Sequence, residues 1–151
     1  MTTNLVFLGD GAVRMEVAHV EQTEPKFVAS GTQLGLIYEL RYRLEPEMLR
    51  LDLVGERTLE LGLDGADFFD LGGSPLFNSI PVIRDRLLEG APHDYVMRLI
   101  DVPSLEVIMS RQRYEPLGDG VVRFRAGEFV SDITFDAYGF VLSYPGIGNR
   151  A

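Results

Sequence analysis

Strict alternation of apolar and polar residues runs through most of this sequence, and this feature constrains the fold more than any other. In the clearest instance, Glu39, Arg41 and Arg43 alternate with apolar or aromatic residues, namely Leu36, Tyr38, Leu40, Tyr42 and Leu44. A period of two residues is typical of a half-buried strand. Runs separated by turn-forming residues predict about nine or ten strands, at residues 13–17, 26–31, 36–44, 49–53, 59–63, 94–102, 105–115, 120–126, 128–136 and 140–144.

Only one segment of the sequence favours a helix. Pro81 suits a first helical position, Gly90 suits the end, and apolar residues between them recur at helical spacing. One helix of barely two turns cannot cover so many strands, so the sheet has to cover its own apolar face. We therefore predict a mainly β fold in one domain over residues 1–151: a strongly curled antiparallel sheet, either a spiral β-roll or a half-barrel, with one or two short helices.

Charge and cysteine content narrow the classes of partner. The 151 residues carry a formal net charge of −9, which disfavours nucleic acid and anionic membrane surfaces. No apolar stretch is long enough to insert into a membrane, and the apolar run at residues 5–8 is too short for a secretory signal. The chain has no cysteine, as is typical of a reducing compartment. We expect a cytoplasmic protein.

Polar residues that could bind a ligand gather in residues 70–81, which interrupt the strand pattern. These and a later strand supply the polar candidates, which are Asp70, Ser74, Asn78, Ser79, Arg84, Gln112, Arg113 and Tyr114. Hydroxyl, amide and guanidinium groups can recognise a polar head group at the mouth of a cleft. Ser-Pro and Asn are also ordinary turn formers, so a purely structural role remains open. The two histidines and the spacing of the acidic residues predict no metal site.

Three groups of motifs resemble a signature of the putative glycolipid-binding family. They are Asp-Leu-Gly, Ser-Pro-Leu and Asn-Ser-Ile-Pro within residues 70–81, Val-Pro-Ser-Leu at 102–105 with Gln-Arg-Tyr at 112–114, and Val-Leu-Ser-Tyr-Pro-Gly-Ile at 141–147. The resemblance covers roughly residues 13–148. It implies a spiral β-roll, similar in shape to the half-barrels of bacterial lipoprotein carriers, with a concave side that accepts acyl chains. It transfers no enzymatic residues.

The main functional hypothesis is non-catalytic binding of an amphiphile, a glycolipid or a fatty-acid-like molecule, in a concave apolar cleft. Its tail would lie inside the roll and its head near Asn78, Arg84 and Arg113. The residues predicted to bind it are Asn78, Arg84, Arg113, Tyr114, Tyr38, Tyr42 and Phe77. We expect no cofactor and no metal. Two alternatives stay open, a carboxylate-dependent hydrolase and an interaction module with a filled core that forms a homodimer through a strand edge.

Overall fold

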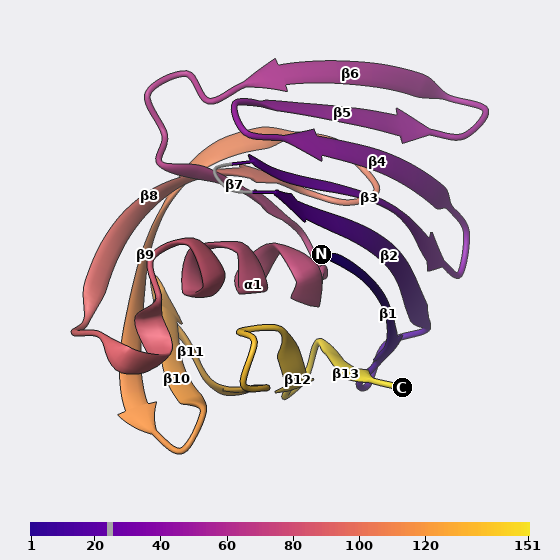
Figure 1. Cartoon of the computed structure of the whole chain (residues 1–151). Coiled ribbons are helices and arrows are strands. Elements are labelled where there is room, and N and C mark those ends of the chain that lie inside the picture. The colour runs from indigo at the N-terminus through magenta and orange to yellow at the C-terminus, as the bar shows by residue number, and fades with distance from the viewer. Residues whose placement is uncertain (24–25) are drawn as a thin grey trace.

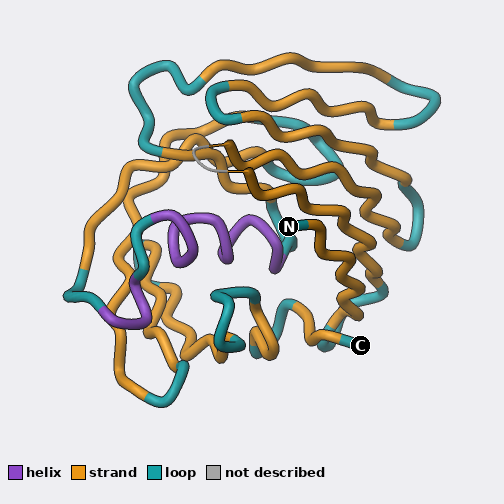
Figure 2. Tube along the Cα trace, in the orientation of Figure 1, coloured by secondary structure: helices purple, strands orange, loops and turns teal. Residues whose placement is uncertain are grey.

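The computed structural model describes residues 1–23 and 26–151, and nearly all of them belong to one sheet (Figures 1 and 2). The strands are β1 (Thr2–Gly9), β2 (Arg14–Thr23), β3 (Lys26–Gly35), β4 (Glu39–Glu45), β5 (Met48–Leu53), β6 (Arg57–Gly62), β7 (Phe68–Leu71), β8 (His93–Ile100), β9 (Val107–Gly118), β10 (Val121–Ala126), β11 (Phe129–Phe135), β12 (Val141–Tyr144) and β13 (Gly148–Arg150). The helices are α1 (Pro75–Arg84) and the single 3-10 turn η1 (Leu87–Glu89).

The sheet consists of two meanders, one from each half of the chain, which are joined by pairing between the first strand and the last. Its thirteen strands follow the order β6-β5-β4-β3-β2-β1-β13-β12-β11-β10-β9-β8-β7. β13 pairs with β1, with Phe7 opposite Arg150. Every neighbouring pair is antiparallel except β7 and β8, which are parallel. A parallel pair needs a crossover connection, and here that connection contains α1.

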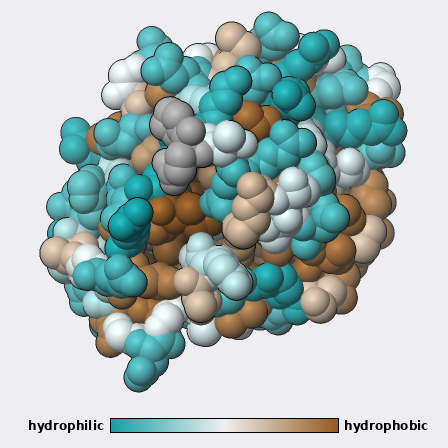
Figure 3. All heavy atoms as spheres, in the orientation of Figure 1, coloured by the Kyte–Doolittle hydropathy of each residue, from teal (hydrophilic) through white to brown (hydrophobic). Residues whose placement is uncertain are grey.

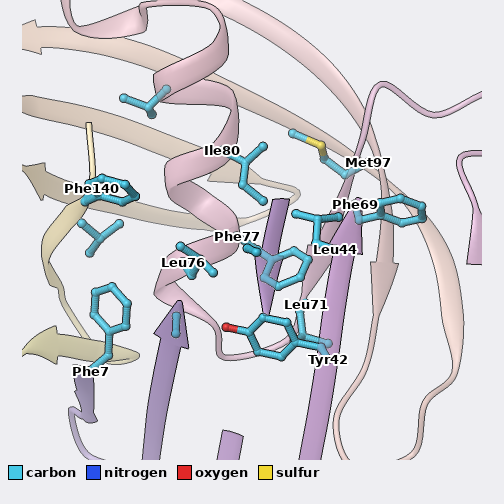
Figure 4. Close-up of a cluster of buried hydrophobic side chains, with 14 of the residues drawn as sticks. Phe7, Tyr42, Leu44, Phe69, Leu71, Leu76, Phe77, Ile80, Met97 and Phe140 are labelled. Atoms are coloured by element: carbon cyan, nitrogen blue, oxygen red, sulfur yellow. The ribbon is translucent and has the colours of Figure 1, made fainter. Parts of the chain in front are cut away.

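Helix α1 packs against the inner face of the bent sheet. In Figure 1, β4–β6 lie above it, β8–β11 to the left, and β12 and β13 below. Residues 75–82 of α1 are all buried, so the helix is covered on most sides. Figure 4 shows Leu76, Phe77 and Ile80 of α1 among side chains from several strands, and Phe77 meets Tyr42 of β4 edge to face at 5.3 Å. The space enclosed by the bend is therefore largely filled.

The predicted β class, the antiparallel pairing and the short helix are confirmed, but the strand count is too low. The predicted strands do not include β1, β7 and β13, two of which are four residues or shorter. The alternation of residues 36–44 is confirmed over β4, in which Leu40, Tyr42 and Leu44 are buried. The strand begins only at Glu39, because Leu36 and Ile37 lie exposed in the preceding turn.

Strand β2 faces the opposite way from the prediction. The pattern at residues 13–17 predicts Met15 and Val17 on the apolar face, with Arg14 and Glu16 toward solvent. In the structure Glu16 is buried and Val17 is exposed. Ala18 and Val20 of the same strand are buried on the inner face. Because side chains of a strand alternate between its two faces, Glu16 lies on the inner face with them.

The predicted helix start at Pro81 is also wrong. Helix α1 begins at Pro75, with Ser74 as its N-cap, and the Ser74 Oγ accepts a hydrogen bond from the Phe77 amide at 3.4 Å. Pro81 lies inside the helix, although an internal proline removes one backbone hydrogen bond. Tertiary burial of the helix outweighs that loss, so residues 75–81 are buried helix rather than surface loop.

No helix in the described ranges has the length and apolar character needed to cross a bilayer. Figure 3 shows hydrophobic side chains gathered in a hollow in the middle of one face, bordered by hydrophilic ones.

Candidate functional site

A cleft of about 240 Å³ opens beside the start of α1, on the inner side of the sheet. One wall is the turn between β7 and α1, residues 70–74, together with Asn78 of α1. The other walls are inner residues of β8 to β12 and Ile147. The central polar segment and the later strands, which are far apart in the sequence, therefore share one cleft.

The polar floor of this cleft is formed by Asp70 and Gln112. Gln112 Nε2 donates to Asp70 Oδ2 at 2.8 Å and to Ser110 Oγ at 3.3 Å. Burial raises the pKa of the Asp70 carboxyl to about 6, and the hydrogen bonds from Gln112 and the Leu71 amide only partly oppose that rise. At pH values above this pKa, the floor carries a negative charge held in place by a buried amide.

Asn78 and Tyr114 form the next polar pair behind the floor. Asn78 Nδ2 donates to the Tyr114 hydroxyl at 3.2 Å, and both residues are buried. Burial and the nearby Asp70 raise the pKa of Tyr114 well above its usual value, so its hydroxyl stays protonated. This pair connects α1 to β9 and fixes the position of the helix against the cleft.

Three aromatic rings form one side of the cleft. The ring centres of Phe124, Phe129 and Tyr144 lie between 6.1 and 6.4 Å apart. Phe129 is 44% exposed and marks the mouth. Ile108, which is 58% exposed, lies opposite Leu99 in the β8–β9 pairing, and Leu99 lines the cleft. The mouth is apolar and the floor is polar.

A second polar network holds the β7–α1 turn from behind. Gln33 Nε2 donates to the Gly72 carbonyl at 3.1 Å, and the Tyr38 hydroxyl donates to Gln33 Oε1 at 3.0 Å. Glu16 Oε1 accepts a hydrogen bond from the Leu76 amide at 3.2 Å, which places a carboxyl group at the N-terminus of α1. Gly73 has a φ of +70°, and the Arg14 guanidinium fills the space that a Cβ would take.

Glu16 is the buried residue that the sequence analysis missed. Desolvation raises its pKa from 4.5 to about 7, and the neighbouring Ser74 hydroxyl and the hydrogen bond from the Leu76 amide only partly oppose that rise. Its second oxygen, Oε2, has no hydrogen-bond partner within residues 1–23 and 26–151. The inverted alternation of β2 hid this residue, and only the orientation of the neighbouring Ala18 and Val20 could have indicated it.

The predicted ligand-binding residues do not form one group. Asn78 lines the cleft with Tyr114 behind it, whereas Tyr42 and Phe77 pack together in the core. Tyr38 belongs to the network behind the turn. The remaining two lie elsewhere: Arg84 over the Phe68 ring, 5.4 Å from its centre, and Arg113 on the outer face with Asp94.

Alternation explains why Arg113 is separated from its neighbours. Gln112 and Tyr114 are buried on the inner face of β9, so Arg113 between them faces outward and pairs with Asp94 at 3.0 Å. The same rule, applied to the sequence, would have selected Gln112 in place of Arg113. Phe129, which is exposed, and Tyr144, which also belongs to the buried core, both line the cleft.

Neither histidine lies in a cluster of metal ligands. His19 is exposed beside Asn4 and Glu21, and the His93 ring stacks on Tyr95 with ring centres 4.3 Å apart. Within the described part of the chain, no three His, Cys, Asp or Glu side chains come together as a metal site.

Residues 51–150 match the model of the family described as Putative glycolipid-binding. The chain belongs to this family. The matched range contains the β7–α1 turn, Gln112 and the aromatic rings of the cleft, and it confirms the resemblance of the central and later motifs. The fold of this family member is similar to the crystal structure of a DUF1089 family protein from Pseudomonas aeruginosa, with a TM-score of 0.58 and 19% identity over 99% of this chain and 92% of the other. No curated protein sequence matches significantly.

Proposed function

We propose that this protein binds an amphiphile, such as a glycolipid, without chemical turnover, in the cleft between the β7–α1 turn and the inner face of β8–β12. The observation that supports this most directly is the contrast within the cleft, because an apolar mouth at Phe129 leads to a polar floor at Asp70 and Gln112. Small-molecule sites typically combine apolar walls with a few fixed polar groups. The family description agrees with such a ligand.

The arrangement favours an amphiphile that enters head first. Helix α1 occupies the inside of the sheet, so a tail has little room there. The cleft of about 240 Å³ suits one head group, and the polar groups lie at its floor. The alkyl chain would lie against Phe129 and Ile108 at the mouth, where each methylene removed from water contributes about 0.8 kcal/mol.

We propose that the sheet acts as a strongly curled half-barrel in this role, similar in shape to the lipoprotein carriers that the family resemblance implies. Strands on several sides of α1 and the hydrogen bond from Arg98 Nη1 on β8 to the Gly62 carbonyl of β6, at 2.6 Å, support this comparison.

Titration with octyl β-glucoside, followed by calorimetry, tests this function directly. Ala126 lines the cleft, so Ala126→Phe fills the space and should weaken binding by about tenfold or more, equivalent to about 1.4 kcal/mol. Val130→Phe is the matched control, because Val130 is exposed on the outer face of the adjacent strand β11. Equal binding by both variants, or no binding by the natural protein, would contradict the proposal.

One observation favours a second candidate, a carboxylate-dependent hydrolase. Asp70 lies in a cleft with its pKa raised to about 6, as is common for a general acid. Glu16, the other carboxyl with a raised pKa, lies behind the turn, and Asp70 is the one carboxylate among the described residues that line the cleft. Turnover of nitrophenyl esters or glycosides that disappears in Asp70→Asn would favour the hydrolase over simple binding.

A further inference from the structure

The most informative unsatisfied group in the cleft is the side-chain oxygen of Gln112. Gln112 is only 3% exposed, and it lines the cleft. Its Oε1 has no hydrogen-bond partner in the part of the chain that the structure describes. Its Nε2 is directed to Asp70 and Ser110, and both of these contacts can accept a hydrogen bond. The amide is therefore oriented with its nitrogen engaged and its oxygen free.

An unpaired buried acceptor is costly, so this oxygen is expected to serve a ligand. The other polar groups of the floor are neutral. Asn78 Nδ2 gives one of its two hydrogens to Tyr114, and the hydroxyls of Ser74 and Ser110 accept from the Phe77 amide and from Gln112. Asp70 contributes a carboxylate, which in its ionised form only accepts hydrogen bonds. The Gln112 oxygen and the Asp70 carboxylate are therefore the groups of the floor that require a donor from the ligand.

The aromatic rings complete the requirements for the ligand. Phe124, Phe129 and Tyr144 offer flat apolar surface beside the floor. Burial and the neighbouring Asp70 raise the pKa of Tyr144, so its hydroxyl stays protonated and can donate or accept. A ligand that fits has hydroxyl donors on a compact ring and carries no negative charge.

From this geometry, and on the basis of the proposed function, we infer that Asp70 and Gln112 select an uncharged polyhydroxyl head group, a saccharide, and reject an anionic head such as a carboxylate or a phosphate. A saccharide hydroxyl donates to Gln112 Oε1 or to the Asp70 carboxylate. A carboxylate head would bring a like charge against Asp70 and an acceptor against an acceptor. The pair acts as a specificity determinant at the floor, and the alkyl chain at the mouth contributes affinity without discrimination.

The test compares two probes with the same alkyl length, octyl β-glucoside and octanoate. Calorimetric titrations are run at pH 8, where Asp70 is ionised, and below the concentration at which either probe forms micelles. We expect the glucoside to bind about tenfold or more tightly than octanoate, the factor that one hydrogen bond to a charged or buried acceptor supplies. Comparable or tighter binding of octanoate would overturn the inference.

Two variants locate the discrimination. Gln112→Met keeps the length of the side chain and removes both the acceptor and the hydrogen bond to Asp70, and it should lower the preference for the glucoside at least severalfold. Asp70→Asn removes the charge, and it should strengthen octanoate binding, a gain that a misfolded variant cannot produce. The control is Ser131→Ala, since Ser131 is a buried inner-face residue of β11 that does not line the cleft. An unchanged preference in both variants would contradict the assignment of these residues.

The outcomes separate this inference from the proposed function. If neither probe binds to the natural protein, the amphiphile function itself fails. If both bind and Ala126→Phe abolishes both, but the glucoside has no advantage, the cleft is the binding site and the saccharide selectivity is wrong.

Discussion

Two carboxyl groups, Glu16 and Asp70, flank the same β7–α1 turn, and they differ in what surrounds them. Glu16 lies behind the turn, where it holds the N-terminus of α1 and is fully buried. Asp70 lies in front of the turn, where it is held by Gln112 and faces the cleft. Both have raised pKa values because of burial. The difference separates a sealed acid that holds the helix from an acid that a ligand in the cleft could reach.

The largest expected effect is the pH dependence that Glu16 imposes on stability. The pKa of Glu16 is about 7 in the folded protein, above its ordinary value of 4.5. Between these pH values the carboxyl is therefore protonated in the folded state and ionised in the unfolded chain. The free energy of unfolding should therefore fall as pH rises from 4.5 to 7, by about 3 kcal/mol. Glu16→Gln should remove this loss, and urea unfolding at pH 5 and pH 8 measures it. A variant whose stability falls as steeply as that of the natural protein would contradict the assignment.

The next largest effect concerns the close packing on the Glu16 side of the turn. A Cβ added at Gly31 would lie 2.3 Å from the Tyr42 hydroxyl and 2.7 Å from the Val17 carbonyl oxygen. Gly31→Ala should therefore lower the free energy of unfolding by about 2 kcal/mol, the usual cost of overpacking. Ala126→Phe, which faces the open cleft, should change it by no more than about 0.5 kcal/mol. A similar loss of unfolding free energy in the two variants would contradict this difference in packing between the two sides of the turn.

A smaller effect is expected at Asp70, because the cleft gives its carboxyl access to water. Its folded pKa of about 6 lies above the ordinary 3.8, so stability again falls as pH rises, here between about 4 and 6. The same linkage sets an upper limit of about 3 kcal/mol, and the access of water to the carboxyl lowers it, so Asp70→Asn should raise stability at pH 8 by about 1 to 2 kcal/mol, less than Glu16→Gln does. Denaturant unfolding of both variants at the same pH gives the comparison, and a reversed order would contradict it.

The smallest effect is expected at Arg113, which the sequence analysis placed in the ligand site. Its ion pair with Asp94 is exposed, so Arg113→Gln should change stability by no more than about 0.5 kcal/mol. Since Arg113 faces away from the cleft, the variant should bind octyl β-glucoside as the natural protein does. A clear loss of affinity for octyl β-glucoside would show that Arg113 contributes to binding and would contradict this prediction.

The fold could be predicted from sequence wherever the strand pattern was regular. β4 and β5 follow the alternation closely, with apolar or aromatic residues inside and charged residues on the outer face, where Arg41 pairs with Glu39 of the same strand at 2.9 Å. The pattern failed at β2, where Glu16 takes an inner position that an apolar residue would normally hold. Helix α1 begins six residues earlier than predicted, because Ser74 caps the helix and Pro75, not Pro81, takes the first helical position.

The candidate site could be predicted in part. The polar segment 70–81 does line the cleft through Asp70, Ser74 and Asn78, and the later Gln-Arg-Tyr motif supplies Gln112. The sequence could not show that α1 would bury Asn78 or carry Arg84 to Phe68. Nor could it show that Gln112 keeps a free oxygen, since that depends on which acceptors its nitrogen meets in three dimensions.

The central claim is that an amphiphile enters the cleft with its head at the Asp70–Gln112 floor. The most direct measurement is an NMR titration of the isotope-labelled protein with octyl β-glucoside, with amide shifts assigned along the chain. The account predicts shifts concentrated at residues 70–74, at Gln112 and around Ala126 and Phe129, together with the Gln112 side-chain amide. Shifts confined to the outer face of β1–β3, or none at concentrations below micelle formation, would contradict it.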